Sequence, residues 1–185
     1  DGSFASGDKI KLTYTIETTD GHALPFAEVD FAGVWISGPT SGYQRVFPAQ
    51  RDQLLLTDVK SKSVLNNDGS YSHTFTDGLV NFGSPLWDTT KFTDGEKSGA
   101  LTPGTYTLAI SATKNYTVGG QPAKDVGGVT ADFQFGNTTP TVREVVTSNN
   151  CARCHVQLQG HGGDFRELKM CLTCHTAGAE DSDST

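Results

Sequence analysis

The sequence has little positive charge and no long apolar run. Its 185 residues include 14 Lys and Arg against 21 Asp and Glu, which gives a formal net charge of -7. An acidic chain repels phosphates and releases few of their counterions, so a nucleic-acid-binding module is excluded. No apolar stretch approaches the roughly 18–20 residues that cross a bilayer, so no transmembrane segment is predicted.

The beginning of the chain lacks a basic-then-apolar leader, and its first residue is Asp1 instead of Met. This start is typical of an exported protein whose signal peptide has been removed. Charged residues are also few, at 19% against the roughly 25% usual for soluble domains. We therefore expect the protein at the outer cell surface or outside the cell, after export through the periplasm.

The four cysteines form two copies of one short pattern. Each copy has two Cys separated by two residues and followed directly by His: Cys151, Cys154 and His155, then Cys171, Cys174 and His175. This spacing is the attachment signature of c-type haem. Two thiols so spaced can form thioethers to the two vinyl groups of one porphyrin, and the adjacent His can coordinate the iron. The pattern predicts two covalent haems, with these two His as proximal ligands.

Two other interpretations of the cysteines remain open. The sixteen residues between Cys154 and Cys171 also fit a zinc ribbon with four Cys ligands. Four Cys could instead form two disulfides in an oxidising compartment. Neither alternative explains why His follows the second cysteine of both pairs in a chain with only 5 His. The haem interpretation therefore ranks first.

Residues 1–140 are predicted to form a Greek-key β-sandwich or barrel. Apolar and polar residues alternate over residues 10–16 and 129–135 with the period of a half-buried strand. Other short strands are expected around Val34 and Leu108, separated by turns rich in Gly, Pro, Asn and Asp. Because this region shows no nucleophile–base pair, we expect a scaffold without catalysis that holds the haems at one end.

Residues 141–178 contain all four cysteines and are predicted to be a small two-haem module with little regular structure. A final strand is expected at 141–148, and short helical turns at 156–159 and 165–170. This segment is too small to bury a core, so the porphyrins would supply most of its apolar mass. The tail at 179–185 is acidic and poor in apolar residues, which predicts disorder.

The order of features in the C-terminal third resembles the opening of the haem domain in the OmcA/MtrC-type outer-surface decahaem cytochromes of metal-reducing bacteria. A Val-Arg-Glu-Val-Val run at 142–146 precedes the first haem motif. The stretch LQGHGG at 158–163 and Arg166 then precede the second motif. The β-region is also similar to the Greek-key domain of that family at 68–71 and 133–135.

This resemblance implies electron transfer outside the cell by haems with two His ligands each. It also implies that His161 is a distal ligand, since the glycines after it let the backbone approach a porphyrin. The family carries many more haems in repeated domains, whereas this sequence has motifs for two. Conduction over a long distance would then need neighbouring haem proteins.

Two haems with paired His ligands need four imidazoles, and the haem segment supplies three. His161 can serve either haem, and serving the second would lock the pair of haems together. The fourth ligand would be His22 or His73, from the same chain or a neighbouring one. The competing roles are a surface residue for His22 and a buried aromatic substitute for His73. Met170 directly precedes a Cys and is badly placed to be a ligand.

Three functions from different classes follow. The first is extracellular electron transfer by a dihaem cytochrome, the second a haem reductase or peroxidase with one open iron site, and the third a β-module with structural zinc. The sequence shows no Arg–His pair beside an unligated site, so we expect no enzymatic activity. Expected partners are extracellular electron acceptors, other multihaem cytochromes and copies of the chain itself. Head-to-tail donation of a ligand between copies would build an open filament.

Overall fold

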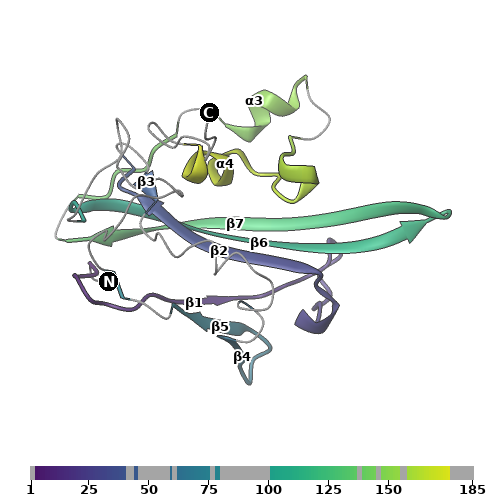
Figure 1. Cartoon of the computed structure of the whole chain (residues 1–185), viewed down its shortest axis with the longest axis horizontal. Coiled ribbons are helices and arrows are strands. Elements are labelled where there is room, and N and C mark those ends of the chain that lie inside the picture. Colours follow the sequence, from purple (N-terminus) through teal and green to yellow (C-terminus); the bar gives the residue numbers. More distant parts are fainter. Residues whose placement is uncertain are drawn as a thin grey trace, which may run out of the picture.

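The computed structural model describes residues 3–40, 44–45, 59, 62–75, 78–79, 101–136, 139–144, 147–154 and 158–175. These residues form two antiparallel β-sheets packed face to face, followed by a C-terminal segment with short helices (Figure 1). The prediction of a mainly β fold is confirmed. No helix within the described ranges has the length and apolar character needed to span a bilayer.

The larger sheet has the strand order β3-β2-β6-β7. Its strands are β3 (Gln44–Arg45), β2 (Phe31–Gly38), β6 (Gly104–Val118) and β7 (Gln121–Phe135). β6 and β7 form one long hairpin whose turn contains Gly119 and Gly120 at φ of 57° and 80°. Glycine adopts this left-handed conformation without steric cost, so a two-residue turn can join the strands.

The smaller sheet has the strand order β1-β5-β4. Its strands are β1 (Lys11–Tyr14), β5 (Tyr71–Thr74) and β4 (Ser63–Leu65), and the short helix η1 (Phe26–Glu28) leads from this layer to β2. β1 is shorter than the predicted alternation because the chain turns back after it. Glu17 already pairs with Ala23 in an isolated bridge.

The main core lies between the two sheets. Alternate residues of β2 and β6 contribute to it, as the period of a strand requires. The buried members from these two strands are Ala32, Val34, Ile36, Tyr106, Leu108 and Ile110. The smaller sheet and its loops complete the core with further apolar side chains, including Ile10 and Phe75.

The outer face of the larger sheet is also buried, and the C-terminal segment covers it. Trp35 and Ala109 lie there in a second cluster with Met170 from helix α4 (Leu168–Cys174), and Phe165 packs against it. Figure 1 shows α4 on the side of β2, β6 and β7 opposite to β1, β4 and β5. The module thus lies across a sheet face and not at one end of the sandwich. This face carries Trp35 and Ala109, which Met170 covers, together with Ser111, which donates a hydrogen bond to the carbonyl of Asp164.

The final strand expected at 141–148 is not formed over residues 141–144. The backbone N–H of Thr141 donates to the side-chain Oγ1 of Thr105 at 2.7 Å. The carbonyl of Thr141 accepts a hydrogen bond of 2.6 Å from Oγ1 of Thr40. Threonine side chains therefore take the place of a neighbouring strand as partners of this backbone.

The helical turns also differ from the prediction. Helix α3 (Ser148–Ala152) contains the first cysteine, whereas residues 158–159 lie in no helix. Helix α4 begins later than the expected turn at 165–170 and continues through the second haem motif. The tail at 179–185 lies outside the described residues.

Candidate functional site

Helix α4 turns one face to the sheet and leaves another free. Met170 and Thr173, three residues apart on one side of the helix, are 1% and 0% exposed. Cys171 is half-buried, and His175, which follows the last turn, is exposed. The side chain of Cys174 lies outside the described residues. The helix is therefore anchored by Met170 and Thr173, the residues that directly precede its two cysteines.

Met170 fills the space above β7. A Cβ added at Gly128 would lie 2.5 Å from Cε of Met170. Met170 can therefore pack against β7 because residue 128 has no side chain. Trp35 and Ala109 surround Met170 from the neighbouring strands. Met170 is therefore 1% exposed, on the side of α4 that faces the sheet.

A buried hydrogen-bond chain joins β2 to the second cysteine motif. The indole N–H of Trp35 donates to Oγ1 of Thr173 at 2.6 Å. The Thr173 hydroxyl in turn donates to the carbonyl of Met170 at 2.6 Å. The indole nitrogen can only donate, and this bond satisfies it in the interior. The centre of the motif is therefore tied to the sheet.

Four aromatic rings, each in contact with the next, form a row from β2 to the surface. Phe165 lies edge-to-face against Trp35, with ring centroids 5.4 Å apart, and against His161, also at 5.4 Å. The centroids of His161 and His175 are 5.8 Å apart, and their planes are inclined by 30°. Both imidazoles are exposed. Two His from separate turns of the chain are thus brought side by side on the surface.

His161 has a left-handed backbone conformation, with φ of 52°. This region costs a residue other than glycine roughly 1–2 kcal/mol. Gly162 and Gly163 follow with φ of 71° and 92°, and the N–H of Gly163 donates to the carbonyl of Gly160 at 2.9 Å. Strained residues of this kind cluster at functional sites, so the conformation marks His161 as a candidate.

Polar contacts anchor the His161 turn to the hairpin of β6 and β7. Nζ of Lys124 donates to Oδ1 of Asp164 at 2.7 Å and to the carbonyl of Gly162 at 3.1 Å. Oγ of Ser111 donates to the carbonyl of Asp164 at 2.9 Å. Lys124 and Asp164 are each 29% exposed, so their ion pair is partly shielded from water. Side chains from both β6 and β7 therefore fix the position of the His161 turn.

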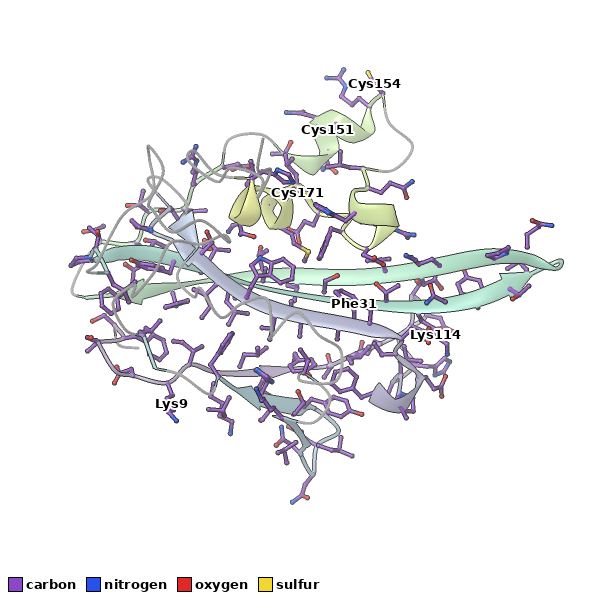
Figure 2. The ribbon with its side chains drawn as sticks, viewed as in Figure 1. Lys9, Phe31, Lys114, Cys151, Cys154 and Cys171 are labelled. Carbon is purple, nitrogen blue, oxygen red and sulfur yellow. The ribbon has the colours of Figure 1, made fainter. Side chains whose placement is uncertain are left out.

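The first cysteine motif lies farther from the sheet. Cys151 is half-buried in α3, and Cys154 is exposed just beyond it, with its N–H donating to the carbonyl of Cys151 at 3.2 Å. Figure 2 shows Cys154 at the outer end of α3, more distant from β6 and β7 than Cys171. His155 lies outside the described residues.

Among the described residues, Cys151 and Cys154 form no disulfide. In the same part of the chain, which leaves out His155 and the side chain of Cys174, no three His, Cys, Asp or Glu side chains converge as ligands of a metal ion.

The two remaining His are in different surroundings. His73 is 1% exposed on β5, and its ring lies edge-to-face with Phe75 at 5.4 Å. Its strand belongs to the sheet on the far side from α4 (Figure 1). His22 is exposed in a turn, with Nε2 3.6 Å from Oδ2 of Asp20. This arrangement favours packing for His73 and leaves His22 accessible.

The second motif fits a covalent haem. Positions 171 and 174 are one helical turn apart in α4, as two thiols bound to one porphyrin require. A metal between two imidazoles needs two bonds of about 2 Å each, which with the inner halves of the rings places the centroids roughly 6 Å apart. The centroids of His161 and His175 are 5.8 Å apart, which is close to this value. Sequence reasoning left open which haem His161 serves, and the structure places the ring of His161 beside that of His175.

Sequence reasoning missed the residues that support the pair. The sequence analysis assigned no role to Trp35, Thr173, Lys124 or Asp164. The one available signal was the nearly continuous apolar run of β2, which indicates a strand buried on both faces. No local sequence pattern indicates which distant segment covers the second face of β2.

No protein-family model matches the chain, and no curated protein matches it either. One similar solved structure is described as the crystal structure of the outer membrane decaheme cytochrome OmcA, with a TM-score of 0.59 and 17% sequence identity. The match covers 98% of this chain and 30% of that one, so this chain spans less than a third of its length. At this identity the likeness shows a shared fold.

Proposed function

We propose that the protein transfers electrons through two covalently attached haems at the outer cell surface or outside the cell. The observation that carries this proposal is the His161–His175 pair beside the second cysteine motif, with ring centroids 5.8 Å apart. The shared fold with an outer membrane decaheme cytochrome supports the same class of function. A bound c-type haem supplies a one-electron change at its iron, at a potential that depends on the axial ligands.

The residues of the second motif have distinct roles in this proposal. Cys171 and Cys174 would hold the porphyrin through two thioethers, each made by adding one S–H across one vinyl group. His175 and His161 would be the residues that hold the iron. With both imidazoles as ligands, this centre would pass electrons without binding a substrate.

The first motif repeats the same residues. Cys151 and Cys154 would attach the porphyrin, and His155 would be its proximal ligand. The haem segment contains no further His once His161 is paired with His175. The distal ligand of the first haem must therefore come from outside the segment, or the position stays open.

We infer that the distal ligand of the first haem comes from His22 of a neighbouring copy. His22 is exposed, whereas His73 is 1% exposed and could bind an iron only if the sandwich opened. Donation from one copy to the next is a head-to-tail contact, and such contacts build filaments when their rotation does not close. The partners are then further copies of the chain, and extracellular electron acceptors receive the electrons.

The competing function is a haem reductase or peroxidase that uses an open distal position on the first haem. It would follow from the same shortage of His in the haem segment. CO binding separates the two ideas, because CO binds ferrous haem with an open position. A filament with His-ligated haems should bind no CO, whereas an enzyme of this kind should bind one CO per chain.

The central experiment is the difference spectrum of the reduced and oxidised protein, made in cells that mature c-type cytochromes. The expected result is two low-spin haems per chain, with a protein mass that includes both porphyrins. The variants C151A/C154A and C171A/C174A should each retain one haem. Bound zinc without a haem spectrum would overturn the proposal.

Electron microscopy of the native protein tests the filament. A helical polymer with its haems in a continuous row is expected. In the variant H22A the polymer should be lost while both haems stay attached. Monomers at high concentration, with both irons already bound by two His of their own chain, would contradict the polymer but not the electron transfer.

A further inference from the structure

We propose that Trp35 is a positioning residue for the axial ligands of the second haem. This inference rests on the proposed function and deepens it, because it names the part of the β-sheet that holds the ligand pair together. Trp35 contacts one residue of each ligand-bearing segment: Thr173 before His175, and Phe165 after His161.

The contact toward His175 is the buried hydrogen bond. The indole N–H of Trp35 and Oγ1 of Thr173 are 2.6 Å apart, and the two residues are 2% and 0% exposed. Helix α4 has seven residues, and a helix this short is not stable without tertiary contacts. The direction of α4, and hence of His175 at its end, is therefore set by Met170 and Thr173 on the sheet.

The contact toward His161 runs through Phe165. The ring of Phe165 meets Trp35 at an interplanar angle of 89° and His161 at 84°. Aromatic pairs prefer such edge-to-face arrangements. His161 itself has φ of 52°, so its turn persists only where surrounding contacts hold it. Phe165 supplies an apolar wall against which this imidazole is held.

Trp35 therefore links α4 and the His161 turn, two segments whose positions depend on tertiary contacts. If the indole loses its hydrogen bond, the Thr173 hydroxyl still donates to the carbonyl of Met170 but no longer accepts a bond from β2. The tie between α4 and the sheet is then weaker, so α4 can tilt and shift His175 relative to His161. Residues behind metal ligands commonly orient them in this way, and their loss weakens the centre without removing a ligand.

The experiment uses the full chain with C151A/C154A, so that only the second haem is attached. In this background we compare W35F with the parent by CO binding to the reduced protein. Phenylalanine keeps an aromatic ring but has no N–H. The population with His161 detached, which binds CO, should rise roughly three- to tenfold, as loss of one buried hydrogen bond predicts. The attached haem content should stay the same.

Threonine variants separate positioning from packing. T173V removes the hydroxyl at nearly constant shape and should raise CO binding as W35F does. T173S keeps the hydroxyl and should restore the parental value. In the double variant W35F/T173V the two effects should not add, because they break the same bond. These variants also keep the test valid if W35F folds poorly.

The matched control is Y106F. The hydroxyl of Tyr106 donates to the carbonyl of Thr102 at 2.7 Å, and its ring belongs to the core between the sheets. Its loss should lower stability without changing CO binding at the second haem. Equal CO binding in the parent, W35F and T173V would overturn the role of Trp35 while leaving the dihaem function intact. A parent without covalent haem would instead overturn the proposed function.

Discussion

The imidazole rings of His161 and His175 lie side by side on the surface, with centroids 5.8 Å apart and planes inclined by 30°. Neither side chain is buried, so packing alone does not explain their approach. The left-handed backbone at His161 adds a cost that the fold must offset elsewhere. An iron bound between the two rings would give this arrangement a function.

Replacing His161 with Ala should open one side of the second iron. The expected result is one high-spin haem that binds CO, with both haems still attached, because neither thiol nor His175 is changed. The measurement is the optical spectrum before and after CO. The control H22A should leave the second haem low-spin. An unchanged spectrum in H161A would remove His161 from the site.

Replacing Lys124 with Met should loosen the His161 turn. The side chain loses its ion pair with Asp164 and its bond to the carbonyl of Gly162. We expect the free energy of unfolding to fall by about 1 kcal/mol, the upper range for such a pair, and CO binding at the second haem to rise. The measurements are denaturant unfolding and CO titration.

Lys114 offers the matched control for this change. It pairs with Glu28 at the other side of the hairpin, and these side chains are more exposed, at 36% and 51%. K114M should therefore cost less stability and leave CO binding unchanged. Similar CO binding in K124M and K114M would show that the ion pair does not position His161.

Replacing Gly128 with Ala should push Met170 away from β7. The new Cβ would lie 2.5 Å from Cε of Met170 and 3.2 Å from the carbonyl oxygen of Ile110. Overpacking of this kind costs about 1 kcal/mol or more. Gly127 is the control, since a Cβ there meets nothing within 4 Å. Thermal unfolding should show a lower midpoint for G128A than for G127A, and equal midpoints would contradict this packing.

The stability of the C-terminal segment should depend on the ionisation of Glu167. Burial raises the pKa of this carboxyl group above its ordinary value of 4.5, and Lys169 opposes the shift. Between the two pKa values the folded chain binds more protons than the unfolded chain, so stability falls as pH rises through this window. The ionised Glu167 is therefore unfavourable near neutral pH.

The variant E167Q tests the direction of this pH dependence of stability. It should be more stable than the parent near neutral pH, and the gain should disappear as pH falls through the raised pKa. The measurement is denaturant unfolding over a series of pH values. An equal gain at every pH would show that packing of the amide, and not the charge, is responsible.

The division into a scaffold at 1–140 and a module at 141–178 predicts that the chain truncated after Thr147 still folds. The main core lies between the sheets and contains no residue of the C-terminal segment. The truncated protein should unfold cooperatively but at a lower temperature, because Trp35 and Ala109 lose Met170 as their cover. It should have no redox activity. Circular dichroism and calorimetry measure the first two properties, and a non-cooperative transition would contradict the division.

Much of the sandwich could be predicted from local patterns. The alternation over residues 129–135 belongs to β7, and the strands expected around Val34 and Leu108 are β2 and β6. The strand expected at 141–148 was wrong over 141–144, because Thr105 and Thr40 bind that backbone with their side chains. Such partners are distant in the sequence, so no local pattern reveals them.

The sequence by itself determined the two Cys-x-x-Cys-His patterns and the main strands of the sandwich. Both depend on spacing along the chain, which covalent geometry and the periods of strand and helix define. Only the tertiary structure decided that His161 lies beside His175, that His73 is buried in the other sheet, and that Trp35 supports the second motif. These relationships arise because the outer face of the larger sheet combines Trp35 and Ala109 with serine and threonine side chains, and the C-terminal segment supplies both apolar contacts and hydrogen bonds to it. Which segment covers it depends on how side chains far apart in the sequence fit together.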